Sequence, residues 1–317
     1  MYNSFLSVVC SIERPEEIDT LADRLSKLAT VLSSNFSDYE IILVNNTASR
    51  NFEKRLESLS ETVRQHIYLI HLSSTIDNNH AVLAGLDRSN GDYTVVYEFL
   101  FADQPERVLE LFEKTQEGFD IVYLRAEDRK MAWGFRWLYR LFYFILRNYS
   151  QLQIDEKAHN MRIISRRALN SLLRLRENLR FMKAIYSMVG YQTDSILVDI
   201  PLQRDRQLSI SEQFRTFLMA ITSFTTFLRS LLLWIFIFSF LFLIAVVFNA
   251  LLVRFTDYDV FGNYHEAISG WTFLVVLISI FFAITCLNLY IMSIYLSNIY
   301  AEIKQRPLYI VESVKRI

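Results

Sequence analysis

Two carboxylates flank the end of an apolar run in the stretch VVYEFLFADQPE, residues 95–106. Glu98 follows the run directly, and Asp103 comes just before Gln-Pro-Glu. One carboxylate can hold Mg²⁺ when phosphates and waters supply the other ligands, so Glu98 and Asp103 are candidate metal ligands. Two simpler interpretations stand beside this one. Glu98 is a solvated residue at a strand end, or Asp103 is the N-cap of a helix with Pro105 and Glu106 in its first turn.

Apolar runs of strand length alternate with segments of helical periodicity in the first part of the chain, which predicts strand, helix, strand, helix. Strands that are apolar on both faces and separated by helices predict a mostly parallel sheet covered on two sides. Ligands of such sheets lie beyond the carboxyl ends of the strands, so the residues after each strand are the candidate site. The predicted strands are Phe5–Cys10, Glu40–Val44, Ile67–Leu72, Tyr93–Tyr97 and Phe119–Leu124, and the predicted helices are 16–32, 52–63, 79–88 and 105–116.

Two long windows without charge lie near the end of the chain, at 231–253 and 271–296. At ~1.5 Å per residue each is long enough to cross a ~30 Å hydrocarbon core, which predicts two transmembrane helices. Lysine and arginine flank the pair, whereas Arg254 is the one basic residue of the connecting loop, 254–270. The positive-inside rule then predicts an integral inner or plasma membrane protein with the head and both termini in the cytoplasm and that loop outside.

An aromatic and basic segment, 131–149, predicts a helix at the membrane interface, and 211–229 is a second candidate. The expected organisation is therefore a head at 1–130 and interfacial and acceptor-side helices at 131–230. Two membrane helices at 231–296 and a cytoplasmic tail at 297–317 follow. The net charge is −1, which does not favour nucleic acid as a partner.

Several segments resemble the membrane-bound polyprenyl-phosphate glycosyltransferases of glycosyltransferase family 2, which are related to dolichyl-phosphate mannose synthase. The segments are LSVVCSIERPEEI, DYEIILVNNTAS, AVLAGLDRSNGDYTVV, GWTFLVV and IYLSNIYAEIKQRPLYIVES. The resemblance implies a GT-A-like, Rossmann-like α/β head that binds a nucleotide sugar and transfers the sugar to a polyprenyl phosphate. It also implies a Mg²⁺ or Mn²⁺ cofactor, if the protein is active, and association into oligomers.

Several functional positions of this family carry other residue types here. Its metal-binding Asp-x-Asp falls on Glu98 and Leu100, and leucine cannot ligate a metal. Its acidic turn for the nucleotide base falls on Asn45 and Asn46, which are uncharged. The acid of its Gly-Asp-Phe-Arg motif is replaced by Asn160. The resemblance thus implies degenerate catalytic positions at Glu98 and Asn160, and substrate-binding positions at Asn45 and Asn46.

Cationic residues remain where the family binds phosphates. They are Arg162, Lys183 and Arg204, and the resemblance assigns them to substrate binding, although Arg204 equally suits a charge attracted to anionic lipid. Near the expected lipid-phosphate site, a Ser-Lys-Tyr motif of the family reads Ser209-Ile210-Ser211, without the lysine.

Three functions fit this pattern. The first is a catalytically impaired member that serves a cell-surface glycan pathway by binding lipid phosphate or a partner. The second is an active, divergent transferase that uses Glu98 for its metal. The third is a non-catalytic subunit, in a homo-oligomer or in a hetero-oligomer with an active paralogue.

Overall fold

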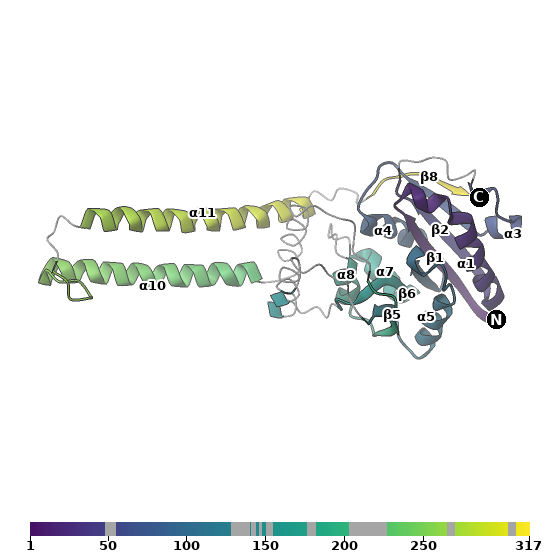
Figure 1. Ribbon diagram of the computed structural model, residues 1–317, viewed down its shortest axis with the longest axis horizontal. Helices are drawn as coiled ribbons and strands as arrows, with labels where there is room; N and C mark the ends of the chain where they lie inside the picture. Colours follow the sequence, from purple (N-terminus) through teal and green to yellow (C-terminus); the bar gives the residue numbers. More distant parts are fainter. Residues whose placement is uncertain are drawn as a thin grey trace. The chain divides into compact units, whose positions relative to one another are not determined.

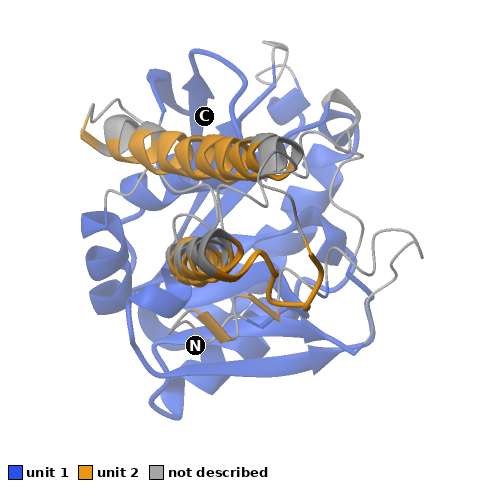
Figure 2. Ribbon diagram, turned by 90° about the vertical axis from the view of Figure 1, so that its left-hand side faces the viewer, with its two compact units in different colours: residues 1–143, 151–210, 305–317 blue, residues 144–150, 211–304 orange. Residues whose placement is uncertain are grey.

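The computed structural model describes most of the chain, with gaps. The described residues are 1–47, 55–127, 140, 144–145, 148–149, 155–175, 182–202, 227–264, 270–303 and 309–317. They fall into two compact units, which Figure 2 draws in blue and orange. Unit 1 holds residues 1–143, 151–210 and 305–317, and unit 2 holds residues 144–150 and 211–304.

Unit 1 is built on a sheet in the order β7-β5-β6-β4-β1-β2-β3-β8. The four neighbouring strands β4, β1, β2 and β3 are parallel, as is the pair of β5 with β7, whereas β6 and β8 run antiparallel to their neighbours. The strands are β1 Tyr2–Ile12, β2 Phe36–Asn45, β3 Ile67–Leu72, β4 Tyr93–Tyr97, β5 Ile121–Ala126, β6 Ala158–Ser165, β7 Thr193–Val198 and β8 Val311–Arg316.

Alternating side chains of β1 enter two separate apolar cores, one on each face of the sheet. Val8 and Cys10 pack with α1 (Leu21–Asn35) and α5 (Arg107–Gln116), whereas Val9 packs with α4 (Asn78–Arg88), α7 (Arg166–Arg174) and α8 (Met182–Met188). Because both faces of these strands are buried, apolar residues fill most positions in the centre of β1 and β2, and the buried Ser7 and Glu40 hydrogen-bond to each other. The predicted α/β head of glycosyltransferase type with helices on two faces is therefore confirmed.

The helix predicted at 16–32 is observed as α1, which begins at Leu21, and its Leu21, Leu25, Leu28 and Leu32 side chains are fully buried. The predicted helix at 105–116 begins later, at Arg107, with Glu106 as its N-cap. Asp103 is therefore not the N-cap, because the chain first makes the short 3₁₀ helix η2 (Phe99–Phe101) and a turn. Within 52–63, the structure describes residues from 55 onward, where a turn precedes the short helix α3 (Glu61–Arg64).

The sheet continues past residue 130, where sequence patterns predicted no strands. β6 inserts between β4 and β5, and β8 adds to the edge of β3 near the other end of the chain. Figure 1 shows β8, in yellow, lying beside the strands of the first hundred residues and close to α4. Residues 309–317 are thus part of unit 1 although α11 of unit 2 precedes them.

Unit 2 contains two long helices, α10 (Phe227–Thr256) and α11 (Gly270–Ile303), and an isolated antiparallel bridge pairs Tyr258 with Tyr264 after α10. Among the described residues, no helix combines the length and the apolar character needed to cross a membrane. The predictions of two transmembrane helices, of an integral membrane protein and of an outer loop at 254–270 are therefore wrong. They rested on the length of two windows that carry no charge. The proposed interfacial helices at 131–149 and 211–229 lie largely outside the described residues.

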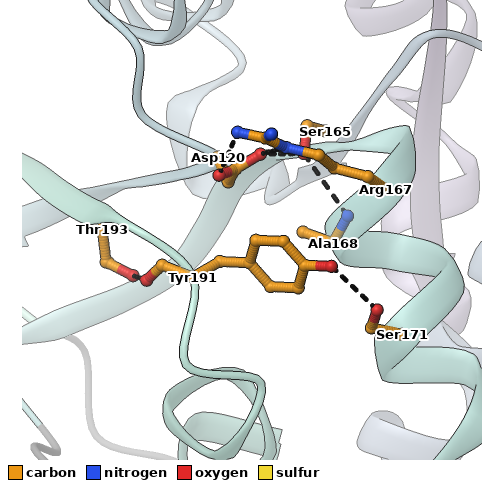
Figure 3. Close-up of polar contacts among 7 residues, drawn as sticks. All are labelled: Asp120, Ser165, Arg167, Ala168, Ser171, Tyr191 and Thr193. Atoms are coloured by element: carbon orange, nitrogen blue, oxygen red, sulfur yellow. Dashed lines mark hydrogen bonds and ion pairs between the residues drawn. The ribbon is translucent and has the colours of Figure 1, made fainter.

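An ion pair between the buried Asp120 and the largely exposed Arg167 fastens the start of β5 to the start of α7. The Asp120 carboxylate accepts hydrogen bonds from Arg167 Nε at 2.5 Å and Nη2 at 2.8 Å, and from Ser165 Oγ at 2.6 Å (Figure 3). Burial raises the pKa of Asp120, but the hydrogen bonds from Arg167 and Ser165 outweigh it and bring the pKa below its ordinary value. Ser165 also caps α7 through Ala168 N–H, so one cluster holds a strand and a helix end.

Replacing Asp120 by Asn will cost about 1–3 kcal/mol of unfolding free energy near neutral pH, because Arg167 and Ser165 lose a charged acceptor. Since folding lowers the pKa of Asp120, its stabilisation is present above the ordinary carboxyl pKa and is lost as pH falls through the folded value. Urea unfolding at a series of pH values will therefore show the difference between wild type and D120N shrinking in acid. Asp103→Asn, at an exposed pair with Lys27, is the matched control and will change stability little. A D120N deficit that stays constant down to the acid limit would contradict this assignment.

Gly85 of α4 lies where the helix meets the sheet. A Cβ at this position would overlap Val9 Cγ1 and lie 3.0 Å from Val44 Cγ2. Gly85→Ala will therefore destabilise the head by about 1–3 kcal/mol, although alanine is the better helix former. Ser26→Ala on the exposed face of α1 is the control, with a change within about 0.5 kcal/mol. Thermal unfolding of both variants measures the difference, and an unchanged or raised midpoint for G85A would show that α4 can shift to make room.

Candidate functional site

The carboxyl ends of β1, β2, β3 and β4 lie along one edge of the parallel strands, and a polar residue follows each of them. Asn46 N–H donates to the Ile12 carbonyl at 3.0 Å, which ties the end of β2 to the end of β1. Ser11 Oγ donates to Asn78 Oδ1 at 2.6 Å, which ties β1 to the first residue of α4. This edge is the candidate site, as the predicted sheet implied.

Glu98 lies at the end of β4, opposite β6. The antiparallel register pairs Val96 with Arg162, and continuing it by two residues places Glu98 opposite Asn160. The Glu98 carboxylate accepts a hydrogen bond from Met161 N–H at 3.3 Å and lies 3.8 Å from His159 Nδ1. The side chain is about a quarter exposed, at 26%. The structure thus brings together Glu98 and Asn160, the two predicted catalytic positions.

His159 is the buried partner of Glu98, and sequence reasoning assigned it no role. Its Nε2 lies 3.0 Å from the Ile200 carbonyl, and its ring packs edge-on against Phe101 at 5.0 Å. A carbonyl only accepts, so Nε2 carries the proton in this contact and Nδ1 is the nitrogen turned to Glu98. The contact with Glu98 becomes an ion pair only when the imidazole is protonated.

Arg162 is almost completely buried, with 3% of its surface exposed. Its Nε donates to the Asn160 carbonyl at 3.0 Å and its Nη2 to the His159 carbonyl at 2.8 Å. The guanidinium lies over the ring of Tyr186 at 3.8 Å from the centroid. Burial lowers the pKa of Arg162, and the nearby Tyr186 and Glu98 oppose that shift. Arg162 therefore holds the backbone of β6 in place, a different task from the predicted phosphate binding, which remains untested.

Asn45 and Asn46, the predicted base-binding residues, are buried at the end of β2. Asn45 Nδ2 donates to His71 Nδ1 at 3.0 Å, and its Oδ1 accepts from Thr47 N–H at 2.9 Å. Asn46 pairs with both backbone groups of Ile76, donating to its carbonyl at 2.8 Å and accepting from its N–H at 2.9 Å. Both amides thus make contacts with the protein itself. His71 was missed by sequence reasoning because a histidine at the end of an apolar strand carries no motif.

A divalent metal does not fit the residues at this edge. Leu100 takes the second carboxylate position and packs against the apolar core below the sheet. Asp103, the other proposed ligand, has a 94% exposed side chain that pairs with Lys27 at 3.4 Å. Within the described ranges, no group of three or more His, Cys, Asp or Glu is placed to hold a metal ion.

Two of the predicted substrate-binding side chains lie outside the described part of the structure. Lys183 belongs to α8, but its side chain is outside the description, and Arg204 lies outside the described residues altogether.

Residues 9–173 match the family Glycosyl transferase family 2, so the chain belongs to that family. It is 27% identical over 312 residues to an uncharacterized glycosyltransferase of Synechocystis sp., covering 98% of this chain and 95% of that protein. It is 28% identical over 287 residues to the SfII prophage-derived bactoprenol glucosyl transferase of Shigella flexneri, covering 88% of this chain and 89% of that protein.

Among solved structures, a mannosyltransferase from Pyrobaculum calidifontis in complex with GDP-Man and Mn²⁺ shares 12% identity. The match covers 70% of this chain and 62% of that one, with a TM-score of 0.43, and we base no conclusion on a likeness this weak.

Arg162→Lys will destabilise the head by about 2–4 kcal/mol, because an ammonium cannot keep the forked contacts or the stacking on Tyr186. The exposed Arg174 of α7 is the matched control, and Arg174→Lys will change stability by less than about 0.5 kcal/mol. Chemical unfolding of both variants makes the comparison. Equal stability of R162K and R174K would contradict the assigned role of the buried guanidinium.

Proposed function

We propose that this chain is a family 2 glycosyltransferase homologue of polyprenyl-phosphate sugar transfer in which turnover is impaired. The family match supports the transferase fold. The names of several relatives support the lipid, since they include bactoprenol glucosyl transferases and an undecaprenyl-phosphate 4-deoxy-4-formamido-L-arabinose transferase. The ligand classes are then a nucleotide sugar and a polyprenyl phosphate, and the pathway is assembly of a cell-surface glycan.

The observation that carries the impairment is the setting of Glu98 and Leu100. Glu98 is engaged by Met161 N–H and lies beside His159, while Leu100 packs on the apolar core. A carboxylate in the position of Leu100 would need to leave that packing and to be hydrated or paired. The chain has therefore adapted this position to packing and retains only one carboxylate there.

Transfer of a sugar from a nucleoside-diphosphate sugar to the acceptor phosphate releases the nucleoside diphosphate, whose negative charge must be neutralised. A divalent ion supplies that neutralisation when it is bound, but the residues here do not fit one. Arg162 does not supply it in its place, because Nε and Nη2 are directed at backbone carbonyls. The acceptor phosphate is itself an anion, so replacing an acid by Asn160 removes little that the nucleophile needs. Stabilisation of the leaving group is thus the step that this site lacks.

The remaining role is non-catalytic. The head holds a lipid phosphate or a partner of the pathway, either as a homo-oligomer or in association with an active paralogue that supplies the chemistry.

An active, divergent transferase is the second candidate. The partial exposure of the Glu98 side chain favours it, because one accessible carboxylate can contribute to a Mg²⁺ or Mn²⁺ site with substrate phosphates and water.

A sugar-transfer assay distinguishes the impaired homologue from the active transferase. Purified full-length protein will be mixed with polyprenyl phosphate in detergent, radiolabelled UDP- and GDP-sugars, and Mg²⁺ or Mn²⁺. We expect no labelled lipid above background, and no difference between wild type and Glu98→Ala. Transfer by the wild type that falls at least about a hundredfold in E98A would establish the active enzyme instead.

Leu100→Asp, with Leu100→Asn as the matched control, tests the cause of the impairment. Both variants lose the apolar contact, at about 1–3 kcal/mol of stability, but only Asp restores a second carboxylate. Titration calorimetry with Mn²⁺ and UDP will show tighter metal-dependent binding to L100D than to L100N. Equal binding to both would show that more than this one carboxylate is missing.

A further inference from the structure

Residues 309–317 close the edge of the sheet beside the candidate site. β8 pairs with β3 so that Ser313 lies opposite His71, and Val311 lies opposite Leu72. The Ile310 carbonyl then accepts from Ser73 N–H at 3.0 Å, just beyond the end of β3. Tyr309 Oη donates to Asp87 of α4 at 3.0 Å, and its ring packs against the core on the α4 face.

One route leads from this segment to Asn45. His71 lies within β3, opposite Ser313, and its Nδ1 accepts the hydrogen bond from Asn45 Nδ2 at 3.0 Å. An amide NH₂ only donates, so this bond requires the His71 tautomer with its proton on Nε2. Asn45 in turn accepts from Thr47 N–H at 2.9 Å. The direction of the Asn45 amide therefore depends on where β3 holds His71.

A second route leads to Asn46. The chain leaves β3 at Ser73, where Ile310 holds it, and reaches Ile76, whose N–H and carbonyl both pair with Asn46. At Asp77 the chain enters α4, and Asp77 caps that helix through Asn79 N–H at 3.0 Å. The 73–77 loop is thus held at Ser73, at Ile76 and at the start of α4.

We propose that the 309–317 segment is the positioning element for Asn45 and Asn46, acting through His71 and through the 73–77 loop. The inference relies on the proposed function only in taking these two residues as facing a ligand. Both belong to the head, so a segment that follows the long helices of unit 2 sets the geometry of a site made by the first hundred residues.

Ser313→Pro tests the proposal, with Val314→Pro as its matched control. Ile317 N–H donates to the Ile67 carbonyl at 3.1 Å, so the alternation of an antiparallel pair turns Ser313 N–H toward β3 and Val314 N–H away from it. Proline at 313 therefore removes a hydrogen bond between β8 and β3. Proline at 314 removes none, and an edge strand tolerates proline at such a position. The two variants therefore introduce the same residue type into the same strand, but only V314P keeps the hydrogen bonds between β8 and β3.

Amide hydrogen exchange of the full-length protein is the readout, because it needs no ligand. In S313P we expect the amides of Ile76 and Thr47 to exchange about tenfold faster than in wild type. In V314P the exchange rates of these two amides will stay within about twofold of wild type. The exchange rates of amides in β6 will be unchanged in both variants. Unchanged exchange at Ile76 and Thr47 in S313P, with faster exchange within β8 itself, would overturn the proposal.

Binding of UDP to the same proteins separates this inference from the proposed function. Weaker UDP binding by S313P than by V314P supports both. If wild type binds no UDP, the proposed ligand is wrong, but the exchange result still decides whether 309–317 positions the two amides. If S313P exchanges faster everywhere and so unfolds, Tyr309→Phe decides, since it removes only the bond to Asp87. An increase of about threefold in the exchange rate of the Ile76 amide in Y309F then supports the proposal, and an unchanged rate rejects it.

Discussion

The buried guanidinium of Arg162 is the constraint on which the head of this protein depends. A charge with 3% exposure is costly unless it is hydrogen-bonded, and the carbonyls of His159 and Asn160 together with the face of Tyr186 meet that need. These contacts shape the backbone of β6 at the point where it passes β4. The same stretch of β6 presents Met161 N–H to Glu98, so a buried charge helps to set the contacts of the carboxylate at the strand end.

The polar side chains of the candidate site have hydrogen-bond partners within the protein itself. Glu98 contacts Met161 N–H and lies beside His159, and Asn46 pairs with the backbone of Ile76. Neutral amides and backbone groups can pair in this way without a counter-charge, whereas a cluster of carboxylates at the same edge needs a cation to offset its repulsion. Amides in place of acids therefore allow the polar groups at this edge to hydrogen-bond with the protein without a bound cation. This physical property links the fold, the poor fit to a metal and the proposed loss of turnover.

The order of the sheet explains how distant parts of the chain reach this edge. β6 inserts between β4 and β5, and β8 covers the outer side of β3. An exposed strand edge is a liability in solution, and β8 moves the edge from the apolar β3 to a strand that carries Glu312, Lys315 and Arg316, while anchoring the loop that follows β3. The 309–317 segment thus has two roles. It covers β3, and through Ile310 and Tyr309 it also contacts Ser73 and α4.

The sequence by itself determined the parallel centre of the sheet. Ile67–Leu72 and Tyr93–Tyr97 are predicted at their observed bounds, because strands buried on both faces are apolar at most positions. It also indicated the glycosyltransferase family and the positions of Glu98, Asn45 and Asn46 at the strand ends. The antiparallel strands could not be read in this way. β8 contains Glu312, Lys315 and Arg316, and its residues are largely exposed, so it has no apolar period to detect. Only the tertiary structure decided that Arg162 is buried, that His71 and His159 contact the candidate residues, and that Asp103 points away to Lys27. Those contacts join residues far apart in the chain, and hydrogen-bond partners of that kind follow from strand order and register, which local patterns do not encode.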